Sequence, residues 1–439
     1  MKILLLRMKI TGAVPLPEAP LGLLYVASVL EMAEQDVIVK DLTFDEITEA
    51  EWGMIKTGEI ELVGITMLSF LRNQAYNLIR KIKEINPRVK VVVGGVHASA
   101  VPLQLVNNLP VDAVIIGEGE YTILDIVGHI QDNKDWKDIK GIATREHGVH
   151  EDRELVQDLD WLPYPAFHKL DLSRYKMSIA SLKPDKVVNN VRLGDAQWVG
   201  MIASRGCPGR CTFCNAFDHW KLKVRIRSAQ NLLDEIEYLR ENFGVRLIAF
   251  NDDAFPINKK QCMEFCEGII KKGWDLAWQT TTRSGVLDQE MCDAMEKSGC
   301  FMIAVGCESG SQKILNNINK HIKVADSVDT IRIINNTSIW SYALLMVGNP
   351  GETDETIKET IDFLKLAKPR IVSYVSGVMI TPATKLFELA KSQGVIKDDF
   401  WIKGEDGLPY YTYEHPYAKM LEWGQRIGQA YPIDFTKLT

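Results

Sequence analysis

Short apolar runs alternate with amphipathic stretches along residues 1–150. The apolar runs are rich in Val and Ile, which predicts β-strands, and the stretches between them have apolar positions three or four apart, which predicts helices. We expect strands at residues 3–8, 37–42, 62–67, 89–94 and 113–117, and helices at residues 22–33, 45–56 and 73–86. Right-handed βαβ crossovers would join these strands into a doubly wound parallel sheet, whose ligand crevice lies at the carboxyl ends of the strands.

The same alternation resumes after residue 198. We expect strands at residues 199–204, 246–250, 276–282, 301–306, 341–347 and 371–378, and helices at residues 229–242, 259–272, 289–297, 324–335 and 354–366. Six parallel βα units predict a partial (β/α)6 barrel. In such barrels the reactive groups gather at the C-terminal ends of the strands.

Between these regions, residues 131–198 lose the alternation and combine charge with prolines and aromatic residues. Trp161, Tyr164, Phe167 and Tyr175 would bury too much apolar area to stay loose, so we expect an ordered connector that clamps two domains together. The sequence therefore predicts an α/β protein with a first domain at 1–140, a connector at 141–198, a barrel at 199–380 and a closing C-terminal extension at 381–439.

Composition narrows the class of protein. The 439 residues are 46% hydrophobic and 25% charged, which is typical of globular proteins, and no apolar run approaches the 18 residues of a membrane span. The opening M-K-I-L-L-L-R is too short in apolar residues for a signal peptide, and all eight cysteines follow residue 206, so we expect a reducing cytoplasm. A net charge of −7 argues against nucleic-acid partners and favours a small-molecule or peptide substrate.

The strongest chemical signal is the stretch S-R-G-C-P-G-R-C-T-F-C, which places Cys207, Cys211 and Cys214 in a C-x3-C-x2-C array. Thiolates at this spacing on one loop can converge on a soft-metal centre. Zinc sites and four-iron clusters take four ligands, so three thiolates leave one metal position open for a substrate. The alternatives are a zinc knuckle or a chance cluster of buried thiols.

This array resembles the cluster-binding motif of radical S-adenosylmethionine (SAM) enzymes. The resemblance implies that the three cysteines hold a [4Fe-4S] cluster whose fourth iron binds the amino and carboxylate groups of SAM. Three further strand ends resemble the family's SAM-holding motifs, namely F-N-D-D-A-F at 250–255, A-V-G-C-E-S-G-S at 304–311 and L-M-V-G-N-P-G-E at 345–352. Each alone could be a glycine turn with helix-capping acids, but together they occur in the family's order.

The same resemblance implies which residues contact SAM. The amino group would meet the strand end with Asn251, Asp252 and Asp253, and Glu308, followed by Ser309, would accept from the ribose hydroxyls. Gly348 and Pro350 would shape the edge that meets adenine, and Phe213 would pack on that base. Arg283 either pairs with the SAM carboxylate or makes a structural ion pair.

Four stretches of the first region resemble the cobalamin-binding domain of B12-dependent radical SAM enzymes: A-P-L-G-L-L-Y-V-A-S-V-L-E, V-G-I-T, V-V-V-G-G-V-H-A-S and D-A-V-I-I-G-E-G-E. The resemblance covers residues 1–140 and implies a Rossmann-like fold. Its implied cobalamin contacts are Leu16, Gly22, Thr66, Ser69, Gly94, Gly95, His97, Gly117, Glu118 and Gly119.

One feature departs from cobalamin domains that supply a histidine to cobalt through D-x-H-x-x-G. No Asp-x-His occurs here, and the loop V-P-L-P-E-A-P-L-G after the first strand contains no imidazole. We therefore expect cobalamin without a histidine lower ligand. His97 is either a ligand contact or a hydrogen-bonded turn histidine.

Three other patterns carry alternatives. The alternating basic residues at 221, 223, 225 and 227 predict a basic strand face, either solvated or anchoring an anionic group. Cys262 and Cys266 could face one metal from a helix, but their apolar neighbours favour small core residues. We expect the C-terminal aromatic residues to shut the open side of the barrel.

The resemblance predicts a B12-dependent radical SAM enzyme that methylates an unactivated carbon of a small molecule or natural-product intermediate. It uses a [4Fe-4S] cluster, SAM and cobalamin, with electrons from an external donor such as flavodoxin or ferredoxin. Ring closure or rearrangement, as in the anaerobic porphyrin cyclases, is the alternative, and a non-catalytic cluster or corrinoid carrier is a third. No catalytic acid or base is identifiable.

Overall fold

The computed structural model describes residues 1–10, 18–177, 182–404 and 407–432. The chain divides into two compact units. Unit 1 contains Met1–Arg174 and Ile396–Leu408, and unit 2 contains Tyr175–Val395 and Pro409–Thr439. No helix among the described residues is long and apolar enough to cross a membrane.

Unit 1 is built on a sheet in the order β2-β1-β3-β4-β5-β6-β7. The strands are β1 (Lys2–Arg7), β2 (Asp36–Asp41), β3 (Ile60–Thr66), β4 (Lys90–Gly94), β5 (Ala113–Ile115), β6 (Ile142–Thr144) and β7 (Gly148–Val149). The first five strands run parallel, whereas β6 and β7 add an antiparallel edge. Residues 3–6 of β1 are buried without alternation, because a parallel sheet is covered on both faces.

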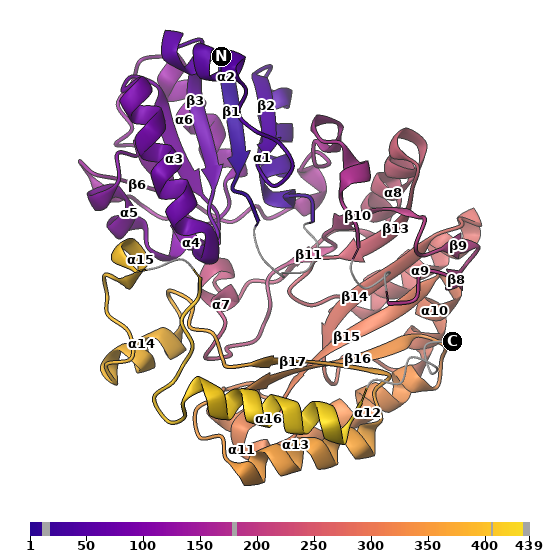
Figure 1. Cartoon of the computed structure of the whole chain (residues 1–439). Helices are drawn as coiled ribbons and strands as arrows, with labels where there is room; N and C mark the ends of the chain where they lie inside the picture. The colour runs from indigo at the N-terminus through magenta and orange to yellow at the C-terminus, as the bar shows by residue number, and fades with distance from the viewer. Residues whose placement is uncertain (11–17, 178–181, 405–406, 433–439) are drawn as a thin grey trace. The chain divides into compact units, whose positions relative to one another are not determined.

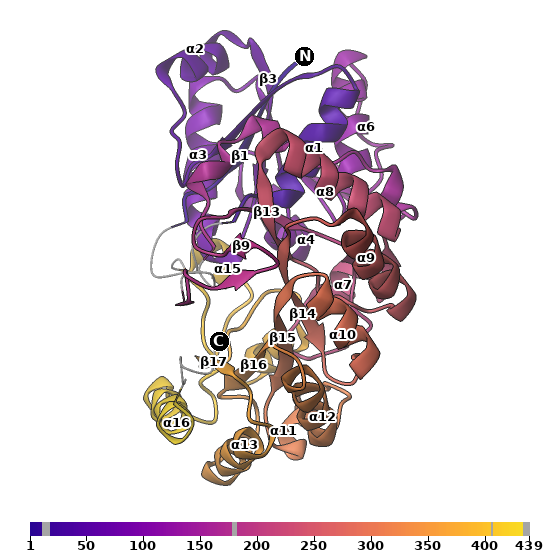
Figure 2. The ribbon, with the colours of Figure 1, turned by 90° about the vertical axis from the view of Figure 1, so that its right-hand side faces the viewer.

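Helices cover both faces of this sheet. Their bounds are α1 (Leu21–Met32), α2 (Glu49–Thr57), α3 (Arg72–Ile85), α4 (Val96–Ala100), α5 (Pro102–Asn108) and α6 (Glu120–Gln131). Figure 2 shows α1 and α6 on one side of the sheet and α2 and α3 on the other. A capping box between Thr48 and Glu51 starts α2 later than the predicted residue 45. The predicted doubly wound parallel sheet is confirmed.

A segment from late in the sequence completes unit 1. Residues 396–408 include α15 (Phe400–Lys403) and pack on α3 through Trp401, whose side chain is fully buried. The Tyr76 hydroxyl donates to the Trp401 carbonyl at 2.8 Å, and the Arg72 guanidinium lies 5.0 Å from the centre of the Phe400 ring. Residues 396–408 are therefore part of the first core, although they come late in the sequence.

Unit 2 contains a six-stranded parallel sheet whose strands follow chain order, and the sheet curls into a half-barrel (Figure 1). The strands are β10 (Gln197–Met201), β13 (Val245–Phe250), β14 (Ala277–Arg283), β15 (Cys300–Glu308), β16 (Trp340–Val347) and β17 (Ile371–Ser376). The helices of the βα units are α8 (Ala229–Phe243), α9 (Lys259–Lys272), α10 (Gln289–Lys297), α12 (Val324–Asn335) and α13 (Asp354–Ala367). The predicted partial barrel is confirmed.

Strand β14 shows how this sheet is packed. Trp278, Thr280 and Thr282 are buried, whereas the alternate residues Gln279 and Thr281 are partly exposed. Trp278 lies within 6.3 Å of the rings of three phenylalanines from β13, the following loop and α9. The buried face of β14 is therefore an aromatic core.

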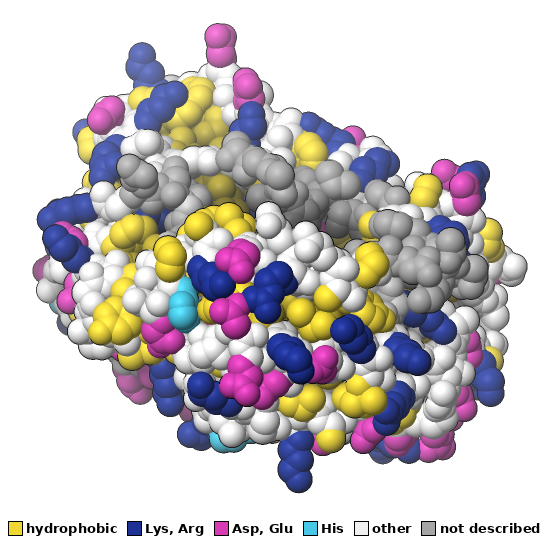
Figure 3. All heavy atoms as spheres, turned by 60° about the horizontal axis from the view of Figure 1, so that its bottom comes forward, with side chains coloured by type: hydrophobic (Ala, Val, Ile, Leu, Met, Phe, Trp, Pro, Cys, Tyr) yellow, Lys and Arg dark blue, Asp and Glu magenta, His cyan; other side chains and the backbone are white. Residues whose placement is uncertain are grey.

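The last helix, α16 (Tyr417–Ala430), packs on β17 and α13. Two glycines permit this approach, because a Cβ at Gly424 or Gly428 would lie 2.8 Å from atoms of Tyr374. Seen from the side of α13 and α16, basic and acidic side chains are interspersed on the surface (Figure 3). Ion pairs such as Lys419 with Asp354 match this mixture, so this face has no patch of a single sign among the described residues.

Candidate functional site

The cysteine loop follows β10 and is braced by a short ladder. Strand β11 (Ser204–Arg205) pairs antiparallel with β12 (Arg225–Ile226). Gly206 has φ +102°, and a Cβ there would lie 2.2 Å from the Lys223 carbonyl oxygen. Only glycine fits this turn, and the loop begins at Cys207 directly after it.

The three motif cysteines lie at the end of this ladder. Burial raises the pKa of the Cys214 thiol to about 11, and the neighbouring Cys211 and Cys207 add to the rise. Backbone N–H groups point at two of the sulfurs, from Gly209 to Cys207 and from Ala216 to Cys214, each at 3.4 Å. Hydrogen bonds to sulfur are typical of iron–sulfur sites.

The spread of the sulfurs bears on the zinc alternative. A tetrahedral zinc ion, bonded at about 2.3 Å to each sulfur, would bring the sulfurs within about 4 Å of one another. Among the described residues, the three sulfurs do not form a group in which all ligand atoms lie within 4.8 Å. The three sulfurs are therefore not gathered as they would be around one zinc ion, and three thiolates leave one metal position open.

Phe213 anchors the loop to the half-barrel. Its partly buried ring packs on a core cluster that contains Ile318, and Met346 of β16 packs on the same cluster. The Thr212 carbonyl accepts from the Leu386 N–H at 2.8 Å, in the first turn of α14 (Lys385–Ser392). Phe213 therefore shares a core cluster with β16, the strand that ends in the G-N-P-G-E turn.

The predicted acidic residues at the end of β13 differ in their surroundings. Asp252 is buried and accepts hydrogen bonds from the Ala203 N–H at 3.0 Å and the Ser204 hydroxyl at 2.5 Å. Burial raises the pKa of Asp252 to about 7. Asp253 and Asn251 are exposed, and Asp253 lies close enough to Cys214 to raise the pKa of that thiol. Asp252 therefore holds the start of the loop, and Asp253, although exposed, accepts from the Gly206 N–H and the Trp220 indole.

Arg283, at the end of β14, lies against the cysteine loop. Its Nη1 is 3.7 Å from the Cys207 sulfur, and its Nη2 donates to the Lys320 carbonyl at 3.0 Å. A Cβ at Gly209 would lie 2.4 Å from Nη1. The guanidinium therefore fits only beside a glycine, and it places a positive charge next to the first thiolate.

Glu308, at the end of β15, has a left-handed backbone with φ +62°. Its Oε1 pairs with the Lys320 ammonium at 2.7 Å, and both side chains are largely buried. The Ser309 hydroxyl bonds with Thr360 at 3.2 Å and accepts from the Ser311 N–H at 3.1 Å. Glu308 thus carries the ionisable group of this strand end, and Ser309 ties the end to α13.

A buried carboxylate shapes the turn after β16. Glu352 accepts from the N–H groups of Gly348 at 2.6 Å and Asn349 at 3.0 Å, and burial raises its pKa to about 7. Gly348 has φ +95°, and a Cβ there would lie 2.5 Å from the Met420 sulfur. The Pro350 carbonyl accepts from the Asn317 amide at 2.9 Å. The predicted adenine edge is therefore a braced turn.

In unit 1, the loops after β3 and β4 meet. Gly95 has φ +93°, and a Cβ there would lie 3.0 Å from Thr66 Oγ1 and 3.1 Å from the Met67 carbonyl oxygen. Gly94, the last residue of β4, accepts from the Met67 N–H at 2.8 Å. Thr66, Gly94 and Gly95 therefore form one neutral surface at the strand ends.

His97 lies beneath this surface and is fully buried. Its Nδ1 is 3.0 Å from Ser69 Oγ, and its Nε2 is 3.0 Å from the Tyr76 hydroxyl. Because the Tyr76 proton goes to the Trp401 carbonyl, Nε2 donates and Nδ1 accepts from Ser69. Burial lowers the pKa of His97 to about 3, with a contribution from Arg72, so the ring is neutral.

The remaining predicted residues of unit 1 lie on the β5 loop and α1. The Gly117 N–H donates to Ser99 Oγ at 3.0 Å, and Glu118 Oε2 accepts from the Val156 N–H at 2.7 Å. Gly119 caps α6, and Gly22 lies in the first turn of α1. Leu16 lies outside the described residues.

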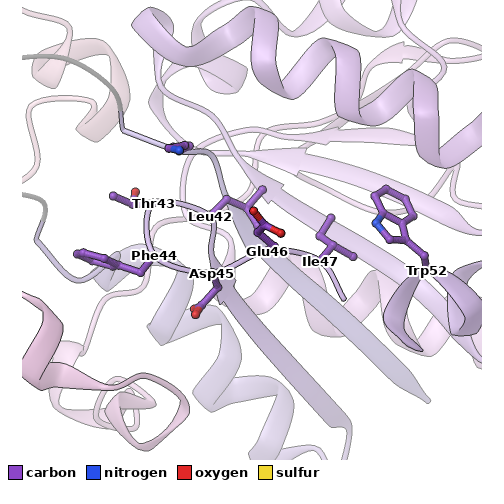
Figure 4. Close-up of a pocket in the computed structure, with 8 residues that line it drawn as sticks. Leu42, Thr43, Phe44, Asp45, Glu46, Ile47 and Trp52 are labelled. Atoms are coloured by element: carbon purple, nitrogen blue, oxygen red, sulfur yellow. The ribbon is translucent and has the colours of Figure 1, made fainter. Parts of the chain in front are cut away.

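A separate hollow of about 420 Å³ lies beyond β2, at the edge of the sheet (Figure 4). It is lined by Lys9, Leu42, Thr43, Phe44, Asp45, Glu46, Ile47 and Trp52. Arg174 reaches its rim, since Nη1 is 2.6 Å from Asp45 Oδ1 and the guanidinium lies over the Phe44 ring. None of these residues belongs to the predicted cobalamin contacts.

The predicted solvated basic strand face is wrong, whereas the anchoring of an anionic group stays a prediction. Lys221 and Leu222 have positive φ, so the extended backbone is limited to β12. Arg225 and Arg227 are buried rather than solvated, and Arg227 pairs with Glu235 at 2.5 Å. The alternating charges predicted a solvated face because a sequence does not distinguish a buried, ion-paired arginine from an exposed one.

Sequence reasoning also missed Ser99 and Lys320. The hydroxyl of Ser99 joins the loops after β4 and β5, and Lys320 joins the ends of β14 and β15. Ser99 ends the stretch V-V-V-G-G-V-H-A-S but was assigned no role, and no sequence signal distinguishes Lys320 from an exposed lysine. Cys262 and Cys266 are fully buried in the apolar face of α9.

The half-barrel with its cysteine loop and the doubly wound first unit define a class of enzyme, in which a radical SAM domain is joined to a corrinoid-binding domain. The family model described as "Radical SAM superfamily" matches residues 201–364, and the model described as "B12 binding domain" matches residues 9–127. The chain therefore belongs to the cobalamin-dependent radical SAM enzymes, whose cofactors are a [4Fe-4S] cluster, SAM and cobalamin.

Relatives agree with this family. The chain is 31% identical over 395 residues to an uncharacterized methyltransferase of Pyrococcus horikoshii, covering 88% of this chain and 81% of the relative. It is 28% identical to the anaerobic magnesium-protoporphyrin IX monomethyl ester cyclase of Rubrivivax gelatinosus, covering 79% of this chain and 60% of the cyclase. The fold is also that of the radical SAM methyltransferase TsrM from Kitasatospora setae, whose structure has tryptophan and a SAM analogue bound. The TM-score is 0.72 at 20% identity, and the match covers 90% of this chain and 77% of the TsrM chain.

Proposed function

We propose that this chain is a C-methyltransferase that acts on an unactivated carbon of a small molecule or natural-product intermediate. One observation carries the proposal. Within unit 2 the cysteine loop and Arg283 contact each other, and both are bonded to the loop that carries Lys320, the partner of Glu308. Thiols, a cation and a carboxylate are therefore grouped at the strand ends of a chain that also has a B12-binding domain.

Each strand end has a proposed role toward SAM. Cys207, Cys211 and Cys214 hold three irons of the cluster. Exposed Asp253 and Asn251 accept from the SAM ammonium, and Arg283 faces the SAM carboxylate across the Cys207 sulfur. Glu308 accepts from the ribose hydroxyls, while the turn over Gly348 and Pro350 and the Phe213 ring enclose adenine. When bound, these cofactors supply a 5′-deoxyadenosyl radical and a transferable methyl group.

In unit 1 the proposed cobalamin surface is neutral. Thr66 and Gly95 at the strand ends, with Gly117, offer close backbone approach, and the Ser69 hydroxyl is fixed by His97. His97 is buried with both ring nitrogens in hydrogen bonds, which favours the hydrogen-bonded turn histidine over a ligand contact. We therefore propose that no imidazole of these loops binds cobalt.

Two further proposals concern the electron donor and the cellular location. The five cysteines outside the motif are free and buried, so they are not arranged as an exposed relay cluster, and an external donor such as flavodoxin or ferredoxin would supply electrons. All eight cysteines are free thiols, which supports a reducing cytoplasm as the protein's location.

A second function, ring closure, is favoured by the cyclase relative. Product analysis separates the two. The anaerobically reconstituted enzyme is incubated with cobalamin, reductant and SAM carrying a deuterated methyl group. Production of S-adenosylhomocysteine together with 5′-deoxyadenosine supports methylation, and 5′-deoxyadenosine alone supports cyclisation. No cleavage of SAM with any reductant would leave only a carrier.

A further inference from the structure

A short segment of unit 2, residues 318–320, holds the cysteine loop. It follows α11 (Gln312–Asn317). The Thr212 N–H donates to the Ile318 carbonyl at 2.9 Å, and the Asn319 amide donates to the Arg210 carbonyl at 2.9 Å. Thr212 and Arg210 both lie between motif cysteines. The segment 318–320 therefore fixes the cysteine loop although it is not part of the motif.

The same segment holds the ends of β14 and β15 through one residue. The Lys320 carbonyl accepts from Arg283 Nη2 at 3.0 Å, and the Lys320 ammonium lies 2.7 Å from Glu308 Oε1. Lys320 is only 5% exposed. A buried ammonium needs a partner of opposite charge, and Glu308 supplies it.

A glycine beside this ion pair leaves space for its two side chains. A Cβ at Gly306 would lie 3.0 Å from Glu308 Oε1 and 3.1 Å from Lys320 Nζ, so a side chain at that position would crowd both groups. Glu308 itself has φ +62°, a left-handed conformation that residues other than glycine rarely adopt. The ion pair with Lys320 holds the carboxylate in this unusual geometry.

We propose that Lys320 is a positioning residue for the ribose of SAM, which orients Glu308 through Oε1 and leaves Oε2 for the ribose hydroxyls. The proposal rests on the assignment of Glu308 to the ribose under the proposed function. It adds that recognition of the hydroxyls depends on a lysine that does not itself contact SAM.

Ligand discrimination tests this role. The cluster-loaded, oxidised enzyme is titrated without reductant, once with SAM and once with its 2′-deoxy analogue, and the two dissociation constants are compared. A hydrogen bond to a charged acceptor should make the wild-type enzyme prefer SAM by about 30-fold. In Lys320→Met the preference should fall below about threefold, with iron content unchanged. Lys297→Met, an exposed lysine on α10, is the matched control and should keep the preference.

Glu308→Met, which removes both acceptor oxygens, separates the possible failures. If Glu308→Met keeps the preference for SAM, Glu308 is not the ribose acceptor, and its assignment and this inference both fall. If Glu308→Met loses the preference but Lys320→Met weakens both ligands equally, the assignment stands and Lys320 is merely structural. Should Lys320→Met lose iron, Lys320→Gln, which can still donate one hydrogen bond, is compared in its place by the same ratio.

Discussion

The strand-end loops of the two units present different chemistry to a ligand. In unit 2 they carry three thiols, an arginine and carboxylates, and Arg283 contacts the Cys207 sulfur and, through Lys320, is linked to Glu308. In unit 1 they carry mainly glycines and hydroxyls, the ionisable His97 is buried and neutral, and Glu118 is buried and accepts from the Val156 N–H. Unit 2 is thus built to bind charged groups and a metal cluster through ligands, whereas unit 1 is built to accept a large ligand through shape.

The largest effect that sharpens this contrast is the loss of iron. Cys207→Ala, Cys211→Ala and Cys214→Ala should each abolish the [4Fe-4S] cluster, because three thiolates are the minimum set. Cys262→Ala and Cys266→Ala should leave iron content unchanged, because both side chains lie in the core of α9. Iron analysis and the visible absorption of the reconstituted variants measure this. Iron that depends on the α9 pair would refute the ligand assignment.

Two glycine substitutions should separate the cofactors. Gly95→Ala would place a methyl group against Thr66 and would force alanine to adopt a positive φ, which costs about 1–2 kcal/mol. Cobalamin affinity should therefore fall about tenfold, while iron is retained. Gly206→Ala should lose iron and keep cobalamin, because its methyl group would collide with the Lys223 carbonyl beside the cysteine loop. Equilibrium dialysis with cobalamin and iron analysis report the two losses.

Gly128→Ala is the control for these variants. It lies within α6 with open space around it, so it should change neither cofactor. Loss of both cofactors in Gly95→Ala would mean that unfolding, rather than local shape, explains the result.

The sequence predicted much of this arrangement, for identifiable reasons. Thiolates at fixed spacing have few structural alternatives, so Cys207 to Cys214 stood out, and β14 was found one residue from its predicted bounds. Lys320 and Trp401 could not be predicted, because their roles depend on partners 12 and 325 residues away along the chain. Short strands such as β6 and β7 carry too few residues for a periodic pattern.

The pH dependence of stability should differ between the units. His97 has a pKa lowered to about 3, so the unfolded chain binds the extra proton and the stability of unit 1 falls as pH drops below about 6.5. Glu352 has a pKa raised to about 7, so its contribution is lost as pH rises from about 4.5 through 7. Each slope is at most about 1.4 kcal/mol per pH unit.

Thermal unfolding across pH 5 to 8 tests these slopes with two variants. The two slopes have opposite signs and overlap between about pH 4.5 and 6.5. His97→Gln should remove the loss of stability as pH falls below about 6.5, and Glu352→Gln should remove the loss as pH rises from about 4.5 to 7. If each variant shifts the curve uniformly without changing its slope, the two groups do not titrate as described.

The most direct test of the contrast is the paramagnetic resonance spectrum of the enzyme with Co(II) cobalamin. If unit 1 holds its corrin without a ligand from His97 or another imidazole, and the corrin's own base is displaced, the cobalt signal should lack superhyperfine splitting from nitrogen. A clear triplet from one bound nitrogen would contradict the account, and its disappearance in His97→Gln would identify the source.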